Sequence, residues 1–186
     1  MTRTATVTIK GVSPYSQSQA LQTEKPSKEQ HAEFEKRIWR ERIHSDESGV
    51  AFIPAMAFKN ALTEAAKYLS LKVPGKRNAT YSKHFEAGIF CDTPMSLGVK
   101  AADVPGEELF VPSDGKRGGG SRVWKTFPLF RNWGGVVTFH VLDETITDDA
   151  FREHMEAAGM FKGVGRFRPG SNGYYGRFEV LSIKWQ

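Results

Sequence analysis

The order in which strand-like and helix-like segments follow one another is the feature that most constrains the fold of this sequence. Residues 3–12 alternate β-branched and polar side chains and predict a strand, and residues 134–142 and 173–185 predict two more. Helical spacing of apolar residues predicts one helix over 55–69 and another over 147–159. This order is typical of a split βαβ unit, an α+β fold in which two helices cover one face of an antiparallel sheet.

Local signals refine these segments. Thr147 is a candidate N-cap for the second helix, and Gly159 is expected to end that helix. In the last strand the apolar alternation changes phase between Val180 and Leu181, which predicts a β-bulge there. Turn-forming residues within 44–53 predict a hairpin before the first helix.

Proline and glycine interrupt all periodicity between residues 70 and 133. We therefore expect one domain over residues 1–186, with an inserted irregular region at about 70–133. The chain has 186 residues, of which 39% are hydrophobic, and no apolar run approaches the ~20 residues that a membrane span requires. Cys91 is the single cysteine, so the sequence predicts a cytoplasmic protein without disulfides.

The basic residues are concentrated in three segments. Residues 65–85, 115–131 and 162–177 hold 14 of the 26 Lys and Arg residues and none of the 21 Asp and Glu residues. Such sorting indicates an electropositive face that binds a polyanion. The alternative, that these cations only solvate long loops, stays open at this point.

A glycine-rich segment over 159–176 contains six of the 18 glycines. Between them lie cations and tyrosines that could bind phosphates and stack on bases: Lys162, Arg166, Arg168, Tyr174 and Tyr175. It is not a nucleotide P-loop, because no Gly-Lys-Ser/Thr follows and the segment comes after a helix rather than a strand. A structural turn whose tyrosines belong to the core is the alternative.

The segment Phe52-Ile53-Pro54-Ala55-Met56-Ala57-Phe58-Lys59-Asn60-Ala61-Leu62 resembles the Y-I-P-G-S-S-L-K-G-A-L segment of the RAMP superfamily of CRISPR-associated proteins. The resemblance covers residues 42–69 closely and 136–180 loosely. It implies a ferredoxin-like fold, similar to that of RNA-recognition motifs. It also implies an RNA-binding subunit of a CRISPR ribonucleoprotein in antiviral defence, with residues 115–131 forming an inserted thumb.

The partners implied by this resemblance are single-stranded guide RNA, other effector subunits, and further copies of the chain along the RNA. No cofactor and no metal ion are expected. From the resemblance together with the basic segments, we expect the following residues to contact RNA: Lys59, Lys116, Arg117, Arg122, Lys125, Lys162, Arg166, Arg168, Tyr174, Tyr175 and Arg177.

Two other functions remain as alternatives. Some members of the superfamily are ribonucleases, and His44 with Asp46 could form a weak metal-independent endoribonuclease site in which the histidine acts as general base. The third alternative is a viral or mobile-element protein that binds single-stranded nucleic acid. The sequence does not distinguish RNA from single-stranded DNA.

Overall fold

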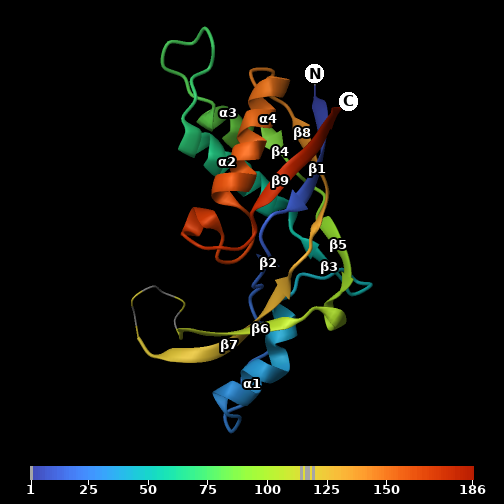
Figure 1. Ribbon diagram of the computed structural model, residues 1–186, viewed down its shortest axis with the longest axis vertical. Coiled ribbons are helices and arrows are strands. Elements are labelled where there is room, and N and C mark those ends of the chain that lie inside the picture. Colours follow the sequence, from blue (N-terminus) through green and yellow to red (C-terminus); the bar gives the residue numbers. More distant parts are fainter. Residues whose placement is uncertain (1, 114, 116–117, 119) are drawn as a thin grey trace.

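The computed structural model describes residues 2–113, 115, 118 and 120–186 and shows a four-stranded antiparallel sheet covered on one face by two helices (Figure 1). The strands lie in the order β4–β8–β1–β9. Their bounds are Arg3–Gly11 for β1, Ile89–Phe90 for β4, Gly134–Val141 for β8 and Phe178–Trp185 for β9, and the helices are α2 (Ala55–Leu69) and α4 (Asp148–Ala157). The predicted ferredoxin-like α+β fold is confirmed.

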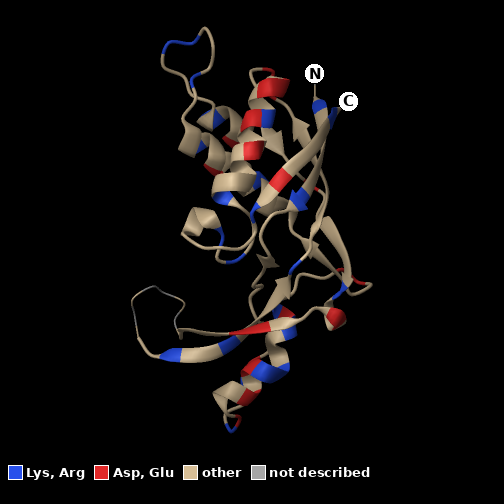
Figure 2. Cartoon of the chain, viewed as in Figure 1, with Lys and Arg blue, Asp and Glu red and all other residues tan. Residues whose placement is uncertain are grey.

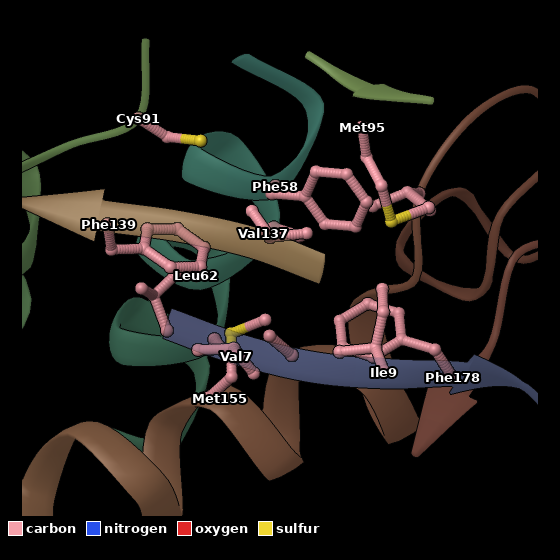
Figure 3. Close-up of a cluster of buried hydrophobic side chains, with 14 of the residues drawn as sticks. Val7, Ile9, Phe58, Leu62, Cys91, Met95, Val137, Phe139, Met155 and Phe178 are labelled. Atoms are coloured by element: carbon pink, nitrogen blue, oxygen red, sulfur yellow. The ribbon is translucent and has the colours of Figure 1, made fainter. Parts of the chain in front are cut away.

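The core lies between this sheet and its two helices. Val7 and Val137 come from the two central strands, and both are fully buried. They lie in one cluster with Phe58 and Leu62 of α2 and Met155 of α4 (Figure 3). The alternation of β1 and the helical spacing of α2 and α4 therefore direct their apolar side chains into the same core.

Two of the local predictions are confirmed and one is wrong. The Thr147 side chain accepts a hydrogen bond from the Ala150 amide and caps α4. The pairing register of β1 with β9 shifts between Thr8 and Ile9, opposite Leu181, as expected of a bulge. Gly159 does not end the helix, because a wide π-type turn continues over Ala158–Lys162. A side chain at this position would lie 2.1 Å from the Phe178 carbonyl oxygen, so glycine permits close packing against β9.

The middle of the chain is more regular than its sequence indicates. It contains α3 (Ser82–Ala87), β4 of the main sheet, and β5 (Met95–Lys100), which pairs with β3 (Val50–Ile53) after the predicted turn. It also contains a long hairpin of β6 (Gly106–Pro112) and β7 (Arg122–Phe130). The short strand β2 (Tyr15–Ser16) pairs with β7, and this hairpin extends to one side of the lower part of the molecule (Figure 1).

A short helix supports the base of the hairpin. Helix α1 spans His31–Ile38 and continues as a 3-10 turn over Trp39–Arg42. Trp39 is buried and lies against the start of β6, where Gly106 leaves room for its ring.

Candidate nucleic-acid interface

The glycine-rich segment folds back on the start of the chain. Gly165 has φ +83°, and a Cβ there would lie 2.3 Å from the Tyr15 ring. The Arg166 amide donates to the Ser16 carbonyl at 2.8 Å, and the Gly176 amide donates to the Pro14 carbonyl at 2.8 Å. These glycines are required by packing within the protein, so the phosphate contacts have to come from the side chains between them.

Two contacts join this loop to the hairpin. The Tyr175 hydroxyl donates a hydrogen bond to the Glu107 carboxylate of β6. Burial, helped by this bond to an anion, raises the pKa of Tyr175 to about 12. The Arg166 guanidinium lies 3.5 Å from the centre of the Phe127 ring of β7. The loop and the hairpin therefore form two walls of one structure.

A cleft of about 680 Å³ lies between these walls. Its described lining residues include no Asp or Glu: Ser18, Arg42, Leu109, Phe110, Val111, Pro112, Gly115, Lys125, Phe127, Arg166, Phe167, Ser171 and Tyr175. Three of them are cations, and several others are aromatic or aliphatic. This combination suits a ligand that carries negative charge beside a flat apolar group.

Arg166 has no carboxylate bound to it in the described structure. Burial lowers its pKa, and the nearby Arg42 guanidinium acts in the same direction. Its buried Nη1 has no hydrogen-bond partner among the described residues. Because an arginine stays charged at neutral pH, this is a cation placed where an anion would stabilise it.

The other cations of the loop have partners within the chain. Arg168 forms a 2.6 Å ion pair with Glu64 of α2, which leaves it less available to RNA than Arg166. The Lys162 ammonium lies 4.3 Å from the centre of the exposed Tyr68 ring. Arg177 donates from Nε to the Met160 carbonyl at 3.2 Å.

The predicted tyrosines differ in exposure. Tyr174 is 57% exposed, whereas Tyr175 is 8% exposed and bonded to the hairpin. Tyr174 offers the more accessible ring for stacking on a base, whereas Tyr175 fits the alternative of a structural side chain and lines the wall of the cleft.

The hairpin and the start of α2 hold the remaining predicted contacts. Arg122 is exposed near the Phe110 ring, and Lys125 donates to the Ser113 carbonyl at 3.1 Å while lining the cleft. The Lys59 ammonium donates a hydrogen bond of 2.6 Å to the Glu86 backbone carbonyl and so provides a partner for this carbonyl in the last turn of α3. Lys116 and Arg117 lie outside the described residues.

The described parts of the three basic segments follow one another along one long edge of the molecule in the view of Figures 1 and 2. Segment 65–85 meets segment 162–177 where Tyr68 contacts Lys162. Segment 162–177 meets segment 115–131 where Arg166 covers Phe127. Segments that are far apart in the sequence are thus neighbours in the fold.

The possible catalytic pair does not assemble. One carboxylate oxygen of Asp46 accepts bonds from the amides of Ser48 and Val50 and from the Ser48 hydroxyl, so this carboxylate shapes its own turn. No hydrogen bond joins it to His44 among the described residues. His44 nevertheless lines a smaller hollow of about 360 Å³ together with Gly165 and Arg166, and burial lowers its pKa.

Sequence reasoning missed two charged side chains, His84 and Arg42, that the fold places beside residues distant in the chain. His84 Nδ1 of α3 lies 2.6 Å from a carboxylate oxygen of Asp143, which follows the C-terminal end of β8. Arg42, buried beside Glu35, lines the cleft although it lies outside the three basic segments. Within one sequence, no local signal could have joined these residues.

Three further observations concern the described part of the chain. None of its helices is both long and apolar enough to cross a membrane. No group of three or more His, Cys, Asp or Glu side chains within it is arranged to hold a metal ion. Burial raises the pKa of Cys91 to about 11, which leaves its thiol protonated at neutral pH.

Known proteins share this fold at low sequence identity. No protein-family model matches the chain, and no curated protein matches its sequence. A chain in the cryo-EM structure of the Type III-B Cmr-beta bound to cognate target RNA aligns over 99% of this protein and 60% of its own length, with TM-score 0.58 and 12% identity. Cmr6 from Pyrococcus furiosus aligns over 97% of this protein and 99% of its own length, with TM-score 0.51 and 16% identity.

The chain has the fold of RAMP-type CRISPR-associated proteins. The resemblance found in residues 52–62 is thereby confirmed as a likeness of fold. The chain spans less than two thirds of the length of the Cmr-beta protein that it matches.

Proposed function

We propose that this protein is an RNA-binding subunit of a CRISPR-type ribonucleoprotein and holds guide RNA along the edge formed by the three basic segments. The observation that carries the proposal is the cleft between the hairpin and the glycine-rich loop. Its described lining contains three cations and no acidic side chain. The fold supports it, since one of the similar chains belongs to a Type III-B Cmr-beta structure that is bound to cognate target RNA.

The residues differ in the part they take. Arg166 and Lys125 line the cleft and are the strongest candidates for phosphate contacts. Arg122 extends the same basic surface along the hairpin, and the exposed ring of Tyr174 offers a stacking platform on the glycine-rich loop. Lys116 and Arg117 join this set on the grounds of sequence alone.

The direct test is to purify the protein and identify any nucleic acid that accompanies it. A single-stranded RNA that RNase removes and DNase leaves intact supports the proposal. Accompanying single-stranded DNA would instead favour the viral or mobile-element alternative. Mass determination of the complex would show whether copies of the chain and other subunits assemble along the RNA.

Salt dependence tests the electrostatic part of the proposal. The logarithm of the affinity for single-stranded RNA should fall linearly with the logarithm of salt concentration, by about 0.7 for each phosphate contact. The triple variant Lys116→Ala/Arg117→Ala/Arg122→Ala should lower both affinity and slope with little change in melting temperature. A flat salt dependence of the parent protein would contradict the reading of these segments as a phosphate surface.

The glycine-rich loop has its own test. Arg166→Ala/Arg168→Ala should weaken RNA binding, and Arg166→Ala alone should account for most of the loss because Arg168 is already paired with Glu64. Arg152→Ala is the control for Arg166→Ala. It also removes one cation, but from an exposed position on α4 away from this edge. If the double variant binds as tightly as Arg152→Ala at physiological salt, the loop is a structural turn.

The endoribonuclease alternative rests on one observation, the position of His44 beside Gly165 and Arg166. The lowered pKa keeps this imidazole neutral at pH 7, as a general base requires. Cleavage of a labelled hairpin RNA in the presence of a chelator, lost in His44→Ala, would establish it. Intact RNA after prolonged incubation would remove it.

A further inference from the structure

Two arginines share the ring of Phe127. The Arg166 guanidinium lies 3.5 Å from the ring centre and the Arg42 guanidinium lies 5.3 Å from it. Arg42 comes from the 3-10 turn after α1, Phe127 from the hairpin and Arg166 from the glycine-rich loop. Both arginines line the 680 Å³ cleft, so three separate parts of the chain bring two cations together at one place.

Within the part of the chain that the structure describes, Arg42 has a carboxylate partner and Arg166 has none. Nη2 of Arg42 lies 3.1 and 3.0 Å from the two carboxylate oxygens of Glu35, and both residues are about 5% exposed. Nη1 of Arg42 has no hydrogen-bond partner among the described residues, and the same holds for Nη1 of Arg166. Two nearby like charges whose buried Nη1 donors lack an acceptor among the described residues are unfavourable, and an anion that accepts from both would stabilise them.

The rest of the cleft defines what else the ligand carries. Phe167 and Tyr175 present ring surfaces, and Leu109 and Val111 form the opposite, aliphatic wall. The volume suits a molecule of nucleotide size rather than an isolated inorganic ion. A phosphate joined to a planar base matches both parts of the lining.

We propose that this cleft is a nucleotide-binding subsite in which the guanidinium groups of Arg42 and Arg166 donate hydrogen bonds to one phosphate while the attached base lies among Phe167, Tyr175 and the aliphatic wall. The subsite deepens the proposed function, on which it rests for the expectation that the nucleotide belongs to a bound RNA strand. A free mononucleotide has the same chemistry, and the experiment separates the two sources.

The probes are adenosine 5′-monophosphate, adenosine without phosphate, and a labelled single-stranded RNA, each titrated into the full chain by calorimetry or fluorescence anisotropy. The wild type should bind the monophosphate saturably in the millimolar range or tighter, and adenosine at least about tenfold more weakly. Arg166→Gln should weaken monophosphate binding at least about tenfold without unfolding the protein, because its guanidinium makes no hydrogen bond to the described chain.

Arg42 needs a paired substitution, since removing it alone would leave Glu35 buried without a partner. Glu35→Gln/Arg42→Gln keeps the volume of both side chains and removes the charges together, and its melting curve shows whether it is folded. The matched control is Arg152→Gln/Glu156→Gln, which removes an exposed pair of the same composition on α4. The first double variant should weaken the monophosphate about tenfold, and the control should leave its affinity unchanged.

Each outcome decides something definite. If the wild type binds RNA but shows no saturable monophosphate binding, or if Arg166→Gln and the control bind it equally well, the subsite is overturned and the proposed function stands. If the monophosphate binds as expected and displaces the labelled RNA, a nucleotide of the strand occupies the cleft. If the monophosphate binds as expected while the protein has no affinity for RNA, the subsite stands for a free nucleotide and the proposed function fails.

Discussion

Gly165 offers the sharpest test of how the glycine-rich loop is built. Its φ of +83° lies in the region that side chains rarely adopt, and a Cβ would lie 2.3 Å from the Tyr15 ring and 2.4 Å from the Ser16 carbonyl oxygen. Gly165→Ala therefore adds backbone strain and a clash of the new Cβ with Tyr15 and Ser16, which are both buried. Gly49 has a similar φ of +77°, but nothing lies within 4 Å of the corresponding Cβ position.

The two glycines separate the contributions to stability. A left-handed backbone costs a non-glycine residue roughly 1–2 kcal/mol, and this term applies to both substitutions. Overpacking costs roughly 1–3 kcal/mol and applies only to Gly165→Ala. We therefore expect Gly49→Ala to lose about 1–2 kcal/mol and Gly165→Ala about 2–5 kcal/mol. For a chain of this size, each kcal/mol lowers the melting temperature by about 2–4 °C.

Thermal and urea unfolding of the two variants, followed by circular dichroism, measure this difference. The reduced entropy of the unfolded chain is the same for both substitutions and cancels in the comparison. Equal losses of stability would refute the tight packing of the loop on Tyr15 and Ser16. Gly165→Val should have a larger effect and should also weaken RNA binding, because displacing the loop moves Arg166.

Three further predictions concern side chains that hold the cleft and the core in place. Burial lowers the pKa of His154 below its ordinary value of 6.5, so the folded state favours the neutral imidazole. The contribution of His154 to the free energy of unfolding is therefore highest above about pH 6.5 and decreases as the pH falls toward the folded-state pKa. Urea unfolding at about pH 7.5 and about pH 5.5 should show this loss in the wild type and less of it in His154→Phe, and identical pH dependence would contradict it. Arg42→Gln alone should cost about 3–5 kcal/mol by leaving Glu35 unpaired, and Glu35→Gln/Arg42→Gln should recover most of that loss in the same measurement. Tyr175→Phe should cost about 1.5–3 kcal/mol by removing the bond to Glu107, and an unchanged urea midpoint would show that this bond does not secure the loop.

The order of elements was predictable because the signals that specify it are local. Three of these signals are the apolar spacing of α2, the alternation of β1 and the phase change beside Leu181. Each is a pattern of neighbouring residues within one helix or strand and can be recognised without knowing the rest of the fold. The Thr147 cap is local in the same sense. With these elements in this order, the ferredoxin-like sheet follows from the connection rules for antiparallel strands.

The hairpin β6–β7 was not predicted, for an identifiable reason. Large apolar rings are exposed on one face of its outer part, as Phe110 and its cross-strand partner Trp124 show, so no clean alternation of apolar and polar residues marks its strands. The connection between the two strands, residues 113–121, is also longer than the tight turns that identify a hairpin from sequence.

The sequence by itself determined strands β1, β8 and β9 of the sheet, its two helices and the grouping of the basic segments, since these depend on periodicity and composition along the chain. Only the tertiary structure decided which cations are available to a ligand. Arg168 is paired with Glu64 although 104 residues separate them, whereas Arg166 lies over Phe127 with no carboxylate bound to it among the described residues. The free energy of a charge depends on its solvation and on its neighbours in space, and the fold alone sets both.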